Sequence, residues 1–215
     1  MENKQQNELG TKNISKLLFS MAIPAITAKI IYLLYNMVDR MYIGHIPNVG
    51  ATALTAVGVT MPIIMVISAF AALVSMGGAP RSSIMMGKGD KDTAEKILGN
   101  CTSALVFISI ALTAVVLIFG EKMLMTFGAS ENTINYALDY LNICAYGTLF
   151  VQLALGLNAF ITAQGFAKTS MLTVLVGAIL NIILDPIFIF VFNMGVKGAA
   201  LATIISQGVS ALWVM

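Results

Sequence analysis

Long apolar segments with few charges are the feature of this sequence that most restricts its fold. Charged residues make up 10% of the 215 residues and hydrophobic residues 58%, whereas soluble domains contain roughly 25% and 45–50%. Such a chain cannot cover a water-facing surface, so we expect an integral membrane protein in contact with the lipid bilayer. A helix needs about 20 apolar residues to cross the hydrocarbon core. We therefore predict an all-α fold with six transmembrane helices, approximately at 15–38, 53–78, 93–119, 133–163, 170–192 and 199–215.

Short polar links set the predicted helix ends. Asp39-Arg40 closes the first helix, and Gly77-Gly78-Ala79-Pro80 closes the second. The link from Arg81 to Lys96 is the most charged, and Asp92-Thr93-Ala94-Glu95 within it is typical of a capping box that opens the third helix. The fourth segment, 133–163, is longer than a membrane requires, so we expect it to bend or to extend into water.

The basic residues predict the orientation. With six helices, the side that receives the N-terminal tail, residues 1–13, carries eight of the twelve lysines and arginines, and the opposite side carries three. Positive charge accumulates on the cytoplasmic side of membrane proteins. We therefore expect a multi-pass protein of a bacterial plasma (inner) membrane with its N-terminus in the cytoplasm.

Several function classes are excluded by what the sequence lacks. A net charge of +2 without a basic patch argues against nucleic-acid binding. Cys101 and Cys144 have no CxxC spacing, so neither a disulfide nor a transition-metal site is indicated. Motifs of hydrolases and metalloproteases are missing, and we expect neither an enzyme nor an organic cofactor. Gly87-Lys88-Gly89-Asp90 matches the GxGD motif of intramembrane aspartyl proteases, but it lies in a lysine-rich link and is interpreted as a turn.

One carboxylate lies inside the apolar run from Asn181 to Phe190. An Asp at a helix centre costs about 2.5–3.5 kcal/mol on insertion scales, so such a residue normally faces a protein interior or a cavity on an ion or proton pathway. Asn181 precedes Asp185 by four residues, which places both on one helix face. Pro186 frees the carbonyl group of Ile182. These oxygens suit a sodium ion or a proton.

Depth along the helices predicts which polar residues can meet. The first and fifth helices run outward. Asp39 lies near the outer end of the first, and Asp185 lies about 10 Å before the end of the fifth. Thr203 lies about 6 Å into the sixth helix, which runs inward. We therefore predict one site for Na⁺ or H⁺, formed by Asp39, Asn181, Asp185 and Thr203. The alternatives are an interfacial role for Asp39 and a helix-packing role for Asp185.

Other residues inside the predicted helices have less specific roles. Pro24, Pro62 and Pro186 lack a backbone N–H, so we expect the helices to bend there. Lys29 lies near mid-depth, roughly 15 Å from Asp39, which is too far for a direct ion pair. It lines the central cavity or has a structural role.

Four sequence segments together resemble one transporter family. They are the Asn-x-x-x-Asp-Pro of 181–186, the Gly-Ala-Ala-Leu-Ala-Thr of 198–203, the Val-Asp-Arg-Met-Tyr-Ile-Gly of 38–44, and Ala163-Gln164-Gly165 with Lys168-Thr169. In this order they resemble the multidrug and toxic compound extrusion (MATE) transporters. Such proteins have twelve helices in two lobes and export cationic or amphiphilic organic compounds in exchange for sodium or protons.

The resemblance implies that this chain is the N-terminal lobe of an antiporter and that a C-terminal lobe completes it. The sequence stops at Trp213-Val214-Met215 inside an apolar helix, which also indicates a truncated half. On matching positions, the resemblance implies that Asp39, Asn181, Asp185 and Thr203 form the cation site. It adds Tyr140 and Asn158 as further members of the network, although Asn158 lies near the inner end of its helix.

Two alternative functions remain open from the sequence. A flippase of lipid-linked saccharides in the same superfamily would need a strongly cationic cavity, for which only Lys29 is available. A channel or a non-transporting membrane subunit would show a repeated pore-lining pattern or a carbonyl filter, and the sequence shows neither.

Overall fold

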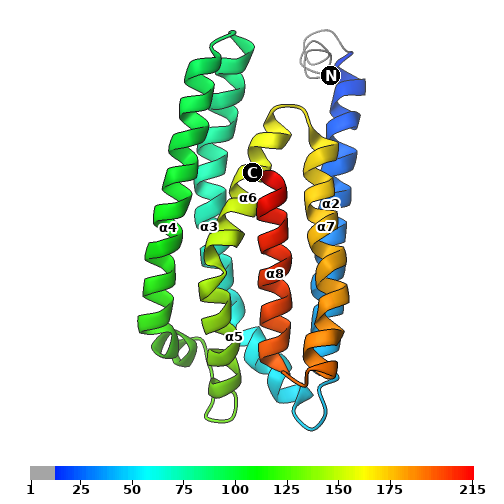
Figure 1. Cartoon of the computed structure of the whole chain (residues 1–215), viewed down its shortest axis with the longest axis vertical. Helices are drawn as coiled ribbons and strands as arrows, with labels where there is room; N and C mark the ends of the chain where they lie inside the picture. The colour runs from blue at the N-terminus through cyan, green and yellow to red at the C-terminus, as the bar shows by residue number, and fades with distance from the viewer. Residues whose placement is uncertain (1–12) are drawn as a thin grey trace.

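The computed structural model describes residues 13–215, and these form a bundle of helices (Figure 1). Of the predicted tail, 1–13, only Asn13 is described, and it caps the first helix by accepting a hydrogen bond from the Ser15 amide. No strand occurs in the described part of the chain. The elements are α2 (Ile14–Gly44), α3 (Gly50–Gly87), α4 (Lys91–Thr126), α5 (Ile134–Tyr146), α6 (Thr148–Ala163), α7 (Ala167–Pro186), the π-helix η1 (Ile187–Val191) and α8 (Val196–Val214).

Four helices are long and apolar enough to cross a membrane: α2, α3, α4, and α7 continued by η1. The pair α5 and α6 makes a fifth crossing if its two parts, which are bent by 56°, form one span. The sixth predicted segment corresponds to α8, which carries Lys197, Ser206, Gln207 and Ser210 among its 19 residues. Because α8 packs between α6 and α7 (Figure 1), these polar residues need not all face lipid.

Two predicted helix ends are wrong. Asp39-Arg40 does not end α2, which continues to Gly44 and buries Asp39. The Gly77-Gly78-Ala79-Pro80 segment does not end α3, which continues to Gly87. A Cβ atom at Gly78 would collide with the side chains of Cys101 and Phe160. This glycine therefore lets neighbouring helices approach closely and does not terminate a helix.

The link between α3 and α4 is a short turn and not the segment from Arg81 to Lys96 that the sequence predicted. Gly89 has a φ of +82°, a conformation that glycine adopts without strain. Asp90, and not Asp92, caps α4 by accepting a hydrogen bond of 3.0 Å from the Thr93 amide. The contact with Thr93 holds the pKa of Asp90 below its usual value. The interpretation of the GxGD sequence as a turn is confirmed.

Glycine and proline change the helices at two further points. The bend between α5 and α6 lies at Gly147, where a Cβ atom would run into the Ile204 side chain of α8. Pro186 ends α7, and the backbone continues as the wider π-helix η1. Pro24 and Pro62 lie inside α2 and α3, and neither interrupts its helix.

The contact between η1 and α8 yields a stability prediction. A Cβ atom at Gly198 would lie 2.7 Å from the backbone carbonyl group of Phe188, whereas the nearest atom at Gly208 would be 3.8 Å away. Gly198→Ala should therefore lower the free energy of unfolding by about 1–3 kcal/mol, because backbone atoms cannot move aside as a side chain can. Gly208→Ala, on the same helix, should raise it by up to about 1 kcal/mol. Thermal unfolding in detergent measures both. Equal stability of the two variants would contradict the packing described.

Candidate functional site

The packing of α2 against α7 brings together two carboxyl groups that lie far apart in the sequence (Figure 1). Asp39 of α2 is 6% exposed and Asp185 of α7 is fully buried. Their carboxyl groups lie close enough to interact directly. Two carboxylates in contact repel unless a proton or a cation lies between them.

Asn181 and Thr203 complete this group. One turn before Asp185, the Asn181 side-chain amide donates a hydrogen bond of 3.1 Å to the Asp185 Oδ1 atom. The same amide lies 3.5 Å from the Thr203 hydroxyl oxygen on α8. The structure thus places the four residues of the predicted cation site, Asp39, Asn181, Asp185 and Thr203, next to one another. Their role in binding stays a prediction.

Unpaired oxygen atoms show what this group can bind. Asp39 Oδ1, Asp185 Oδ2 and Asn181 Oδ1 are buried and accept no hydrogen bond from the described residues. A buried acceptor without a donor costs about 1–3 kcal/mol, and more if it is charged. All three are hard oxygen ligands, which suit a sodium ion, and a carboxyl pair can also share a proton. The arrangement therefore fits either cation that the sequence predicted, a sodium ion or a proton.

The remaining predicted residues lie at different distances from this group. Tyr140 of α5 is buried, and its side chain is in contact with Thr203. Asn158 of α6 does not bond to either carboxyl group; its amide donates to the backbone carbonyl of Ser170, at 3.2 Å. The Lys29 ammonium group lies 5.4 Å from the ring centre of Tyr32, in a cation–π contact.

A cleft of about 240 Å³ adjoins the carboxyl pair and is bordered by Asp39. Most of its lining is apolar, and within the described part of the chain no lysine or arginine borders it. Sequence reasoning missed several polar residues of this lining, among them Tyr35, Asn36 and Gln207. Polar residues of α2 recur at helical spacing, at Tyr32, at Tyr35 or Asn36, and at Asp39. Their shared face could therefore have been found from the sequence.

Comparison with known proteins identifies the family. A family model described as MatE matches residues 24–187, which is more than half of the chain. The chain belongs to the MatE family. It is 29% identical over 213 residues to the multidrug export protein MepA of Staphylococcus haemolyticus, and the match covers 99% of this chain and 47% of the relative. It is 29% identical over 205 residues to the probable multidrug resistance protein YpnP of Bacillus subtilis, with 94% and 45% covered.

Solved structures support the family assignment and the fold. The chain superimposes with a TM-score of 0.88, at 26% identity, on a structure described as the outward-facing conformation of a multidrug resistance MATE family transporter of the MOP superfamily. The match covers 96% of this chain and 45% of that one. This MatE chain therefore spans about half the length of the relatives and structures that it matches.

The hydrogen bond between Asn181 and Asp185 can be measured with a double-mutant cycle. Asn181→Ala and Asp185→Ala, alone and together, should show a coupling of about 1 kcal/mol in the free energy of unfolding. As a control, Gln152→Ala combined with Asp185→Ala should be additive, because the amide of Gln152 bonds to the Ile67 carbonyl on α3 instead. Additive effects in both cycles would contradict the bond within α7.

Proposed function

We propose that this MatE chain is one lobe of a cation-coupled antiporter that exports amphiphilic or cationic organic compounds. The observation that carries the proposal is the contact between the buried pair of carboxyl groups, Asp39 and Asp185, at the edge of a largely apolar cleft. The relatives named as multidrug export and multidrug resistance proteins support the class of substrate.

The charge of the carboxyl pair gives a coupling mechanism. A proton or a sodium ion bound between Asp39 and Asp185 removes negative charge from the edge of the cleft. When that cation leaves, the charge returns and attracts an organic cation into the cleft. Since an intramembrane carboxylate is strongly unfavourable without a partner, either the coupling cation or the substrate has to be present. The coupling cation and the substrate are therefore exchanged.

The lining of the cleft suits the proposed substrates. Met61, Met65 and Ile64 provide flexible apolar contacts, and methionine adapts to ligands of different shape. Tyr32 and Tyr35 add aromatic rings that attract cations. A flippase for anionic lipid-linked saccharides would instead need basic groups along this cleft.

A second lobe is part of the proposal, because the relatives are about twice as long as this chain. The outer surface of α2 exposes large apolar side chains, among them Leu33 and Met37. In a membrane these side chains face lipid or the second lobe. We place the N-terminus on the cytoplasmic side of the bacterial plasma membrane because of the basic residues in the links on that side.

The coupling site can be tested with two separate variants, in each of which one aspartate is replaced by asparagine. Asp185→Asn removes one charge of the pair, so it should abolish the binding of sodium or of a proton and stop efflux driven by an ion gradient. Asp139→Asn should leave binding intact, because Asp139 is 43% exposed and pairs with Lys197 at 3.2 Å on the surface. Isothermal titration with sodium and a pH titration measure binding. Efflux at the wild-type rate by Asp185→Asn, assayed with both lobes present, would exclude the pair as the coupling site.

The chain by itself should bind the coupling cation without exporting any compound. All four proposed ligand residues lie in this chain, whereas alternating access requires one half to rock against another. Vesicles that contain only residues 1–215 should therefore show no dye export under a sodium or proton gradient, and adding the C-terminal half as a second chain should restore it. Gradient-driven export by this chain alone would refute the one-lobe account.

A further inference from the structure

A lysine without an acidic partner lies in the middle of α2, away from the carboxyl pair. Lys29 is exposed, and no carboxylate of residues 13–215 lies within ion-pair distance of its ammonium group. That ammonium group lies 5.4 Å from the ring centre of Tyr32. An unpaired charge inside a membrane costs more free energy than one cation–π contact returns, so a charged residue there indicates a functional partner. Lys29 therefore requires an acidic group from outside the described residues.

Lipid headgroups are too far away to supply that acidic group. The hydrocarbon core is about 30 Å thick, so a residue near its centre lies about 15 Å from the headgroups on either side. Lysines near the ends of membrane helices can extend to the headgroups. Lys29, however, lies midway between the ends of α2 at Ile14 and Gly44. The acidic group has to come to mid-depth, either on a compound in the cleft or on a second lobe.

One face of α2 connects Lys29 with the carboxyl pair. Tyr32, Asn36 and Asp39 follow Lys29 at steps of three or four residues, so their side chains share a helix face with it. All three border the cleft. The side-chain amide of Asn36 donates a hydrogen bond of 2.7 Å to the Tyr32 carbonyl group. This face therefore begins at a positive charge and ends at a carboxyl group, about 15 Å apart along the helix axis.

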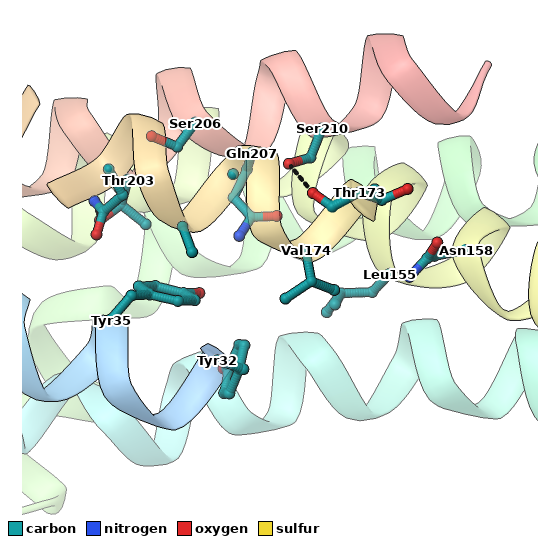
Figure 2. Close-up of a pocket in the computed structure, with 14 residues that line it drawn as sticks. Tyr32, Tyr35, Leu155, Asn158, Thr173, Val174, Thr203, Ser206, Gln207 and Ser210 are labelled. Atoms are coloured by element: carbon teal, nitrogen blue, oxygen red, sulfur yellow. Dashed lines mark hydrogen bonds between the residues drawn. The ribbon is translucent and has the colours of Figure 1, made fainter. Parts of the chain in front are cut away.

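A second space along α2 extends the cleft beside Tyr32. This narrow cavity, of about 40 Å³, lies between α2, α6, α7 and α8 and shares Tyr32, Tyr35 and Gln207 with the cleft. Figure 2 shows the two tyrosine rings across from Gln207 and other polar side chains of α8. Tyr32 is 38% exposed, and the Lys29 ammonium group lies over its ring. A compound in the cleft that extends over this ring comes within reach of Lys29.

The arrangement favours a transported compound over a second lobe as the source of the acidic group. An ion pair between two lobes would need only Lys29 itself. Instead, Lys29 and Asp39 lie at the two ends of one helix face, with aromatic and apolar surface between them. A drug-sized compound that carries an amino group and a carboxylate meets the complementary charge at each end. A single lysine suits one acidic group, in contrast to the several basic groups that a lipid-linked saccharide would need.

We propose that Lys29 binds the acidic group of transported compounds that carry both a positive and a negative charge. This inference rests on the proposed function and adds to it a class of substrate and a residue that selects it. The amino group of such a compound lies toward Asp39, and its aromatic part lies against Tyr32. Its carboxylate accepts hydrogen bonds from the Lys29 ammonium group. Lys29 thus distinguishes a zwitterion from a compound that is only cationic.

A rhodamine dye with a free carboxylate and the methyl ester of the same dye are matched probes for this inference. At neutral pH the free acid is a zwitterion, and the ester is a cation of almost the same shape. The full chain is placed in lipid nanodiscs, and fluorescence anisotropy gives the dissociation constant of each dye, with empty nanodiscs as the blank. The ratio of the two dissociation constants does not depend on how much of the protein is folded.

Lys29→Met keeps the length of the side chain and removes its charge. It should weaken the binding of the free acid about tenfold, because a hydrogen bond to a charged group is lost, and leave the ester within about twofold of wild type. Lys29→Arg keeps the charge, so the ratio should stay within about threefold of wild type. Lys16→Met removes an exposed lysine of the same helix, about 20 Å away, and should change neither constant. Thermal unfolding checks that all three variants are folded.

An unchanged ratio in Lys29→Met would overturn the inference, and so would a wild-type chain that binds neither dye. A third contrary result concerns efflux with the C-terminal half added. If Lys29→Met bound both dyes like wild type but exported both equally slowly, the partner of Lys29 would be an acid of the second lobe. The proposed function would stand in each case in which the ester is still exported under an ion gradient. It would fail if Asp185→Asn exported the ester at the wild-type rate, whatever the ratio in Lys29→Met.

Discussion

The contact between two buried carboxyl groups is the constraint on which the rest of this structure depends. Asp39 and Asp185 face each other in a membrane-embedded bundle, and three oxygen atoms of this group lack a donor among residues 13–215. Such a site would push α2 and α7 apart if it held no cation, because like charges repel strongly where water is scarce. Under the proposed function, cation binding at this pair is therefore linked to the packing of α2 against α7, and a small ion would act on the arrangement of helices around the cleft.

Small residues and a proline give the site its shape. Gly198 lets α8 begin directly against the backbone of η1, and η1 follows Pro186, the residue next to Asp185. Gly177 leaves space opposite Ser210 at the narrow cavity. The backbone geometry that positions the carboxylate thus depends on close approaches that only glycine allows. Substitutions at these glycines would disturb the packing around the site.

The sequence predicted the fold class and the neighbours of Asp185 better than it predicted the helix ends. Helical spacing placed Asn181 beside Asp185, and depth along the helices placed Asp39 and Thr203 at the same level. The predicted ends at Asp39 and Gly78 were wrong, because charged residues and glycines end helices in water but serve contacts inside a bundle. The polar lining between α7 and α8 was missed because serines and threonines are common in membrane helices, and only their shared face distinguishes them.

Infrared spectroscopy of the carboxyl groups tests most directly whether the pair holds an exchangeable cation. The account predicts that the purified chain shows a band of protonated carboxylic acid that disappears as pH is raised. If sodium is the coupling ion, adding sodium at constant pH should remove the band. If the proton is the coupling ion, the band should stay unchanged. The band should be lost in a variant that carries both Asp39→Asn and Asp185→Asn. A spectrum that responds to neither pH nor sodium, or that is the same in the double variant, would contradict the account.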